Sequence, residues 1–257
     1  MRSAKRLLLL GGLVLLVGGS FTSVRLPAQQ VKVTDPATVV LIVARDSNEI
    51  VYMDIRNNSI IGRTFLGNNV NPHMVMMSPD GRYVVTGGTR ANKAFIIDAH
   101  TLQLVKVINV DIAPEHLAFS PDSRWYYQGN PQGDSISVID MQSLTKIKTI
   151  PGFAEPLNVT FTTDGSKAYV GNYGANWVGV VDVRRHELLK KIQIAPPPGV
   201  ARLDPDRYLG DIHGINNATP TPDGRYLYAA AGTLGVVGVI DTREDKVVKV
   251  IRVGADP

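Results

Sequence analysis

The chain has 257 residues, of which 44% are hydrophobic and 19% are charged, an ordinary globular composition. The net charge is +4, and Arg2, Lys5 and Arg6 supply most of it, so no basic face for nucleic acid is indicated. The chain has no cysteine. This excludes disulfides, covalently attached c-type haem, thiolate zinc sites and iron–sulfur clusters.

The N-terminus has the pattern of an export signal. Basic residues in positions 2–6 precede an apolar run from Leu7 to Gly19, which is short for a bilayer span and typical of a signal-peptide core. No clean A-x-A cleavage site follows it. We therefore expect residues 1–28 to be a signal peptide, or else an uncleaved anchor that is the only membrane contact. The remainder is then periplasmic or extracellular.

Two motifs repeat along the rest of the chain. The first is a turn between two apolar runs, as in SPDGRYVVTGG, and its aspartates are Asp80, Asp122, Asp164 and Asp223. The second resembles VGVIDTREDKVVKVI, and its aspartates are Asp98, Asp140, Asp182 and Asp241. Both sets are spaced by 42, 42 and 59 residues. Two markers with one period indicate a structural repeat.

A fifth copy precedes these four. The segment EIVYMDIRNNSIIGRTFL places Asp54 at the position of Asp98, and Thr34-Asp35-Pro36-Ala37 falls at the position of the Ser-Pro-Asp-Gly turn. The earlier segment TVVLIVARDSN aligns with YVVTGGTRANK, which pairs Arg45 with Arg90. We expect VKVTDPATVV, residues 31–40, to be a degenerate copy of the first hairpin.

Each unit predicts four short strands. Ser-Pro-Asp-Gly favours a hairpin turn, because Pro fixes φ at the second position and Gly accepts the positive φ that closes the turn. Alternating apolar segments follow, and helix signals are weak. The predicted fold is therefore all-β: a β-propeller of four-stranded antiparallel blades, with about five blades in a domain spanning 29–257. The expected blades are 31–67, 72–110, 114–151, 156–194 and 213–253, with an insert at 195–212.

These repeats resemble the YVTN-type β-propeller family, most closely in TTDGSKAYVGN and VGVIDTREDKVVKVIRVG. Relatives of that repeat include cytochrome d1-like haem propellers, quinone amine dehydrogenase heavy chains, surface-layer proteins and lactonase-like enzymes. The resemblance implies the fold and not the function. It also implies seven blades, so five copies favour an incomplete or partner-completed propeller over a closed five-bladed ring. The last residues, IRVGADP, match the connector that leads into a further blade.

The repeated aspartates are expected to accept hydrogen bonds within turns, since copies spread over five blades cannot converge on one ligand. The insert at 195–212 is the main irregularity. It is stiffened by three prolines, and it carries Arg202 and, near its end, Asp211. An insert of this length is either a ligand- or partner-contacting loop or a plain surface insertion.

Three histidines, His73, His116 and His213, stand just before first strands, in positions expected at the channel mouth. Converging imidazoles could ligate a metal, and the resemblance to cytochrome d1-like propellers implies a non-covalent haem, with Arg45 and Arg90 pairing its carboxylates. The alternative is that each histidine makes only local hydrogen bonds. His100 and His186 are expected to be solvated turn residues on the opposite face.

Tyr173 and Trp177 either form an aromatic surface at the mouth or pack against the neighbouring blade, and packing is favoured. No nucleophile–base motif, P-loop or zinc-protease motif is present. We therefore expect a non-enzymatic scaffold that binds a partner protein or small ligand at the mouth, with no cofactor firmly implied. The alternative is an oxidoreductase that binds haem or serves a quinone- or haem-linked electron-transfer system.

Overall fold

The computed structural model describes residues 33, 35–196, 198–199, 214–254 and 257. All the described residues belong to one compact unit. The predicted signal segment 1–28 and most of the insert 195–212 lie outside the described residues. Among the residues that are described, no helix has the length and apolarity needed to cross a bilayer.

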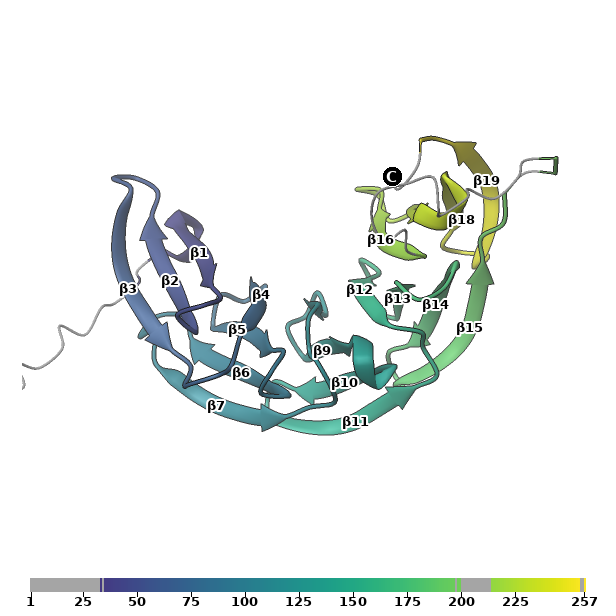
Figure 1. Cartoon of the computed structure of the whole chain (residues 1–257). Helices are drawn as coiled ribbons and strands as arrows, with labels where there is room; N and C mark the ends of the chain where they lie inside the picture. Colours follow the sequence, from purple (N-terminus) through teal and green to yellow (C-terminus); the bar gives the residue numbers. More distant parts are fainter. Residues whose placement is uncertain (1–32, 34, 197, 200–213, 255–256) are drawn as a thin grey trace, which may run out of the picture. The chain divides into compact units, whose positions relative to one another are not determined.

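The described residues form five antiparallel sheets whose strands follow one another in chain order (Figure 1). We call these sheets blades 1 to 5. Blade 1 contains β1 (Val39–Ala44), β2 (Glu49–Asp54) and β3 (Ser59–Phe65). Blade 2 contains β4 (Pro72–Met77), β5 (Tyr83–Gly88), β6 (Lys93–Asp98) and β7 (Leu104–Asn109). Blade 3 contains β8 (Leu117–Phe119), β9 (Trp125–Asn130), β10 (Ser135–Asp140) and β11 (Thr145–Pro151).

Blades 4 and 5 repeat the same four-strand order. Blade 4 contains β12 (Pro156–Phe161), β13 (Lys167–Asn172), β14 (Trp177–Asp182) and β15 (Glu187–Gln193). Blade 5 contains β16 (Ile215–Pro220), β17 (Tyr226–Ala231), β18 (Val236–Asp241) and β19 (Lys246–Arg252). Short 3-10 turns occur at Pro36–Thr38, Pro131–Gly133 and Gly232–Leu234. The all-β fold with propeller-type blades is therefore confirmed.

Blade 1 differs from the expected four-stranded unit, because three of its strands fall within the described residues. Its β1 corresponds to the second strand of the other blades, since it pairs with β2 as β5 pairs with β6. The segment expected to form a degenerate hairpin turn is a 3-10 turn, in which the Asp35 carboxylate accepts the Ala37 backbone N–H at 3.0 Å. Asp35 thus fills the role that Asp80 has in blade 2.

Each internal blade buries both of its faces, because side chains alternate across a strand. In β13, Val170 belongs to the cluster shared with blade 3, whereas Tyr169 belongs to the cluster shared with blade 5. Successive first strands also pack against one another, from β4 through β8 and β12 to β16. The core is therefore a series of inter-blade layers. The ring is not closed, and blades 1 and 5 are the two ends of the series.

The repeated aspartates stabilise turns, as the sequence predicts. Asp80 accepts hydrogen bonds from the Ser78 hydroxyl at 2.6 Å and from the Arg82 backbone N–H at 3.1 Å, and the other hairpins repeat this pattern. Asp98, in the second motif, accepts the backbone N–H groups of the turn that follows it. These carboxylates belong to the scaffold.

Candidate binding site at the channel mouth

The two ends of the blades are built from different segments. At one end, which we call the mouth face, the loops between second and third strands contact the connectors that join blades. Arg90 N–H donates to the Val70 carbonyl at 3.2 Å, and Tyr173 N–H donates to the Glu155 carbonyl at 2.9 Å. The other end, the hairpin face, holds the Ser-Pro-Asp-Gly turns and the turns after the third strands, as the bond from Ala99 N–H to the Arg82 carbonyl shows.

A repeated cap fixes the connectors at the mouth face. Asn48, Asn92 and Asp134 end three equivalent loops with φ of 57°, 53° and 48°. This left-handed conformation is one that Asn and Asp tolerate better than most residues. Their side-chain oxygens accept backbone N–H groups of the connector that leads to the next blade, at 2.8–3.0 Å. First strands therefore begin at fixed positions.

His73 and His116 lie together at this face, although they come from different blades. Their ring centroids are 5.9 Å apart and their planes are tilted by 40°. They occupy different repeat positions: His116 corresponds to Met74, one residue after His73. The ladder between β4 and β5 is irregular between Pro72 and Val75, the segment that contains His73. Such a bulge changes the direction of a side chain and brings the two rings together.

Both imidazole rings are half-buried, and the hydrogen bonding of the pair is incomplete. The Nδ1 atom of His73 is buried and has no hydrogen-bond partner among the described residues. Burial, and secondarily the neighbouring His73, lowers the pKa of His116 to about 4. His116 is therefore neutral at pH 7 and keeps a lone pair on one ring nitrogen, as a metal ligand or hydrogen-bond acceptor must. The two rings are thus close together although they come from separate blades.

Two fully buried side chains fix the backbone of His116. The Gln128 side-chain amide donates to the His116 carbonyl at 2.9 Å, and the Tyr126 hydroxyl donates to the Gln128 side-chain oxygen. Gly87 leaves room for this arrangement, because a Cβ there would lie 2.8 Å from the Pro114 carbonyl and 2.9 Å from Gln128 Oε1. Sequence analysis missed this support. The available sequence signal was Gln128, a polar residue that follows three aromatic residues in a predicted strand.

The two candidate arginines do not act as a matched pair. In blade 1, Ala44 pairs with Glu49, and in blade 2 the equivalent pair is Gly88 and Lys93. Ala44 is therefore equivalent to Gly88. The next residue, Arg45, is equivalent to Thr89 and not to Arg90. Arg45 donates to the Asn71 side-chain oxygen at 2.9 Å and stabilises the connector before His73. It is therefore a supporting residue of that connector, and its contact with a ligand carboxylate stays a prediction.

Arg90 lines a separate hollow of about 380 Å³ between blades 1 and 2. Its walls include Val70, Phe95 and Val107, and Lys93 lies at the same hollow. Neither cation has a hydrogen bond or ion pair from its side chain among the described residues. The hollow could accept an anionic group beside an apolar one.

The remaining candidates at the mouth have different outcomes. Trp177 is buried, stacks near Phe153 with ring centroids 6.3 Å apart and carries Lys191 Nζ 4.3 Å above its ring, so it belongs to the core. Tyr173 is half-buried in its loop. His213, Arg202 and Asp211 lie outside the described residues. Within the described parts of the chain, no cluster of three metal-ligating side chains is found.

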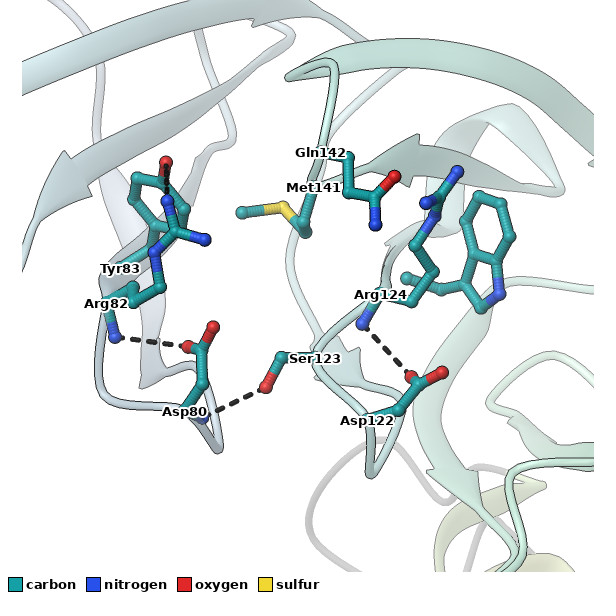
Figure 2. Close-up of a pocket in the computed structure, with 9 residues that line it drawn as sticks. Asp80, Arg82, Tyr83, Asp122, Ser123, Arg124, Met141 and Gln142 are labelled. Carbon is teal, nitrogen blue, oxygen red and sulfur yellow. Dashed lines mark hydrogen bonds between the residues drawn. The ribbon is translucent and has the colours of Figure 1, made fainter.

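The hairpin face also has a hollow, of about 440 Å³, between blades 2 and 3 (Figure 2). Asp80 and Asp122 flank it, but both carboxylates accept bonds within their own turns, and the Asp80 N–H donates to the Ser123 hydroxyl at 2.9 Å. A similar hollow of about 570 Å³ lies between blades 4 and 5. Because equivalent hollows form between different pairs of blades, we attribute them to the repeated fold. The mouth face is therefore the better candidate for a binding site.

The two histidines expected to be solvated turn residues differ. His100 is exposed, and its Nδ1 lies 2.9 Å from the Val33 carbonyl oxygen. His186 is 7% exposed, and the expectation for it was wrong. Its Nδ1 lies 2.7 Å from the Tyr127 hydroxyl, and its ring packs edge-on to Trp125 with centroids 4.6 Å apart. The turn after β14 contacts the preceding blade. A contact between two blades cannot be predicted from the sequence pattern of one repeat.

Comparison with known proteins supports the fold. The profile of the YNCE-like β-propeller family matches residues 33–207. A hydrazine synthase chain from Kuenenia stuttgartiensis is similar at 27% identity and a TM-score of 0.63, over 73% of this chain and 51% of that one. This chain thus spans about half the length of that relative.

A functionally unknown protein from Desulfotomaculum acetoxidans is similar in structure, with a TM-score of 0.70 at 13% identity. The similarity covers 86% of this chain and 68% of that one, and at this identity it shows the fold alone. No curated protein matches the chain.

Proposed function

Because the chain belongs to the YNCE-like β-propeller family, we propose that it is an exported binding scaffold that holds a small ligand at its mouth face. One observation carries the proposal: His73 and His116 converge from two blades, with the Nδ1 atom of His73 buried and unpartnered. Buried polar atoms are normally hydrogen-bonded, so an exception calls for an explanation. A bound ligand group supplies one.

The scaffold acts by rigid display. Residues before His73 are held by Asn48 and Arg45, and the carbonyl of His116 is held by Gln128. A site whose groups are already in place loses little conformational entropy on binding. This supports a binding role.

The chemistry of the pair restricts the ligand. A neutral imidazole has no charge to attract an anion, but one ring nitrogen donates a lone pair to a transition-metal centre or accepts a hydrogen bond, and the other donates one through its N–H. Metal–imidazole bonds are about 2.0–2.1 Å long, so two rings with centroids 5.9 Å apart can share one ion after small adjustments. The proposed ligand class is therefore a metal ion or an uncharged small molecule with a metal or a hydrogen-bonding group at its centre.

Zinc is a suitable probe of this site. We expect calorimetric titration of the purified chain with Zn²⁺ to detect binding that His73→Ala and His116→Ala each weaken by at least about tenfold. His100→Ala is the matched control, since it removes an exposed imidazole from the hairpin face. If all three variants bind Zn²⁺ as the parent chain does, the imidazole pair is not the site.

A haem-binding redox propeller is the second candidate, and the same pair favours it. Haem would supply electron-transfer chemistry, and His73 or His116 would hold its iron, while Arg90 remains the predicted partner of a haem carboxylate. Haemin added to the protein should then give a Soret band that shifts on binding and is lost in the double variant His73→Ala/His116→Ala. A spectrum equal to that of free haemin would reject this candidate. Hydrazine synthase activity is not proposed, because the similarity covers half of that chain.

Export is proposed from the sequence of residues 1–28. In cells that express the full chain, the protein should be found outside the cytoplasm. A variant that lacks residues 2–28 should stay in the cytoplasm. Fractionation with antibody detection measures both forms. Equal cytoplasmic retention of the two would contradict the proposal.

A further inference from the structure

Two positive charges lie at the hollow of about 380 Å³ between blades 1 and 2, which we call the cation hollow. Arg90 is exposed and Lys93 is half-buried, and neither side chain makes a hydrogen bond or ion pair with another described residue. No Asp or Glu is among the described residues that line the hollow. An anion in the hollow would therefore meet two unpaired cations and no opposing carboxylate there.

The wall beside these charges is apolar and held in place by packing. Lys93 and Phe95 lie on the same face of β6, two residues apart, and Val107 of β7 pairs directly with Phe95. Val70, from the connector after blade 1, closes the wall. Gly88 permits this packing, because a Cβ there would lie 2.6 Å from Val70 Cγ1 and 2.9 Å from Phe95 Cε2. A ligand that uses both parts of the hollow has an anionic group and an apolar one.

Comparison of the blades shows that the scaffold does not require these cations. The loop between the second and third strands has the same length in all five described blades, so its positions align without gaps. The counterparts of Arg90 are Asp46, Gln132, Gly174 and Thr233, and those of Lys93 are Glu49, Ser135, Trp177 and Val236. Among the five described blades, only blade 2 has a cation at either position. The two charges are therefore a local feature of the cation hollow, unlike the turn aspartates, which recur.

Blade 4 shows the same position occupied by a large side chain. Trp177 is the counterpart of Lys93, and Phe153 is the counterpart of Leu66, since both donate a backbone N–H to the last residue of an equivalent loop. The rings of Trp177 and Phe153 are stacked with centroids 6.3 Å apart, and Trp177 is 6% exposed. An indole thus packs beside Phe153 between blades 3 and 4, at the position where Lys93 borders a hollow between blades 1 and 2.

We propose that the cation hollow binds a phosphate monoester that carries a small aryl or alkyl group. Such an ester has a charge of about −1.5 to −2 at pH 7, which the two cations match. The planar guanidinium of Arg90 can donate two parallel N–H bonds to phosphate oxygens, and the ammonium group of Lys93 adds a compact charge. The organic group contacts the wall of Phe95 and Val107. This site is separate from the imidazole pair and does not rest on the function proposed above.

Phenyl phosphate is the probe, and calorimetric titration of the purified chain at pH 7 and low salt measures its binding. We expect Arg90→Gln and Lys93→Gln each to weaken binding by at least about tenfold, because each removes one charge that faces the phosphate. Lys93→Trp should abolish binding, since it gives blade 2 the residue that occupies the equivalent position in blade 4. Inorganic phosphate should bind at least about tenfold more weakly than phenyl phosphate, because it leaves the apolar wall in water.

Lys106→Gln is the matched control, since it removes an exposed cation of β7 that is next to Val107 in sequence but does not line the hollow. This variant and His73→Ala/His116→Ala should bind phenyl phosphate like the parent chain, and circular dichroism should show the same β-content in all variants. Four results would overturn the proposal: no binding by the parent chain at millimolar phenyl phosphate, an equal loss in Lys106→Gln, inorganic phosphate bound as tightly as the ester, or loss of binding in the double histidine variant.

Discussion

Two histidine sites of the same fold differ in what their rings contact. The His186 ring lies at the hairpin face, bonded to the Tyr127 hydroxyl and packed on Trp125 of the preceding blade. The His73 and His116 rings lie at the mouth face beside each other, and Nδ1 of His73 has no partner among the described residues. The first site is complete within the protein, whereas the second lacks a partner. Position in the repeat does not distinguish these two sites, whereas the hydrogen bonding of their rings does.

The largest effect is expected at the complete site. His186→Asn should lower the free energy of unfolding by about 4 kcal/mol, because it removes buried ring contacts and leaves the Tyr127 hydroxyl without its partner. Asn tolerates the left-handed backbone at this position, where φ is 54°. Urea unfolding at pH 7 measures the loss. His100→Asn, at an exposed turn, should cost less than about 0.5 kcal/mol, and equal losses would remove the distinction.

Acid should destabilise the protein through His116. Its pKa is about 4 in the folded chain and about 6.5 when unfolded, so the unfolded state binds the proton first as the pH falls. Stability is full above pH 6.5 and decreases toward pH 4, by up to about 3 kcal/mol from this group. Burial also lowers the pKa of His186, which adds to the loss in the same direction.

The variant His116→Gln tests this assignment. Its urea unfolding should depend less on pH between 6.5 and 4.5 than that of the parent chain. A variant with the parent's full acid sensitivity would show that other groups cause the loss. His186→Asn should reduce the dependence as well, so the two variants together divide the acid effect between the two sites.

A smaller effect is expected from Tyr127→Phe. This change removes the hydroxyl partner of His186 and keeps the aromatic packing with Phe161, whose ring centroid lies 4.8 Å from that of Tyr127. The loss should be about 1 to 2 kcal/mol, the usual cost of leaving a buried polar atom unpaired. Urea unfolding of Tyr127→Phe, His186→Asn and the double variant should show coupling between the residues. Strict additivity would argue against the bond.

The smallest stability effect is expected at the mouth. His73→Phe removes the buried, unpartnered Nδ1 and keeps a ring, so the free energy of unfolding should change by less than about 0.5 kcal/mol or rise. The same variant should lose Zn²⁺ binding. A loss of several kcal/mol in its urea unfolding would show that His73 is a structural residue, and the contrast with His186 would fail.

The sequence predicted the fold well, because repetition supplies the evidence several times over. Turn residues such as Asp80 and Gly81 recur in several blades and fix the hairpins, and paired spacings locate the strands. The positions of His73 and His116 before first strands raised the possibility that they converge, with local hydrogen bonds as the alternative, and the irregular ladder at His73 leaves no sequence mark. His186 and Gln128 could not be assigned, because their partners come from another blade or a connector. Packing was favoured for Trp177 from the sequence, and the structure buries it against Phe153.

Nitrogen NMR of histidine rings in the isotopically labelled protein tests the central claim most directly, because each ring reports its own ligand. During titration with Zn²⁺, the ring nitrogens of His73 and His116 should shift together and saturate at the same concentration, while those of His186 stay unchanged. That result would show that the mouth imidazoles act as one site. Unchanged His73 and His116 signals, or shifts confined to His100 and His186, would contradict it.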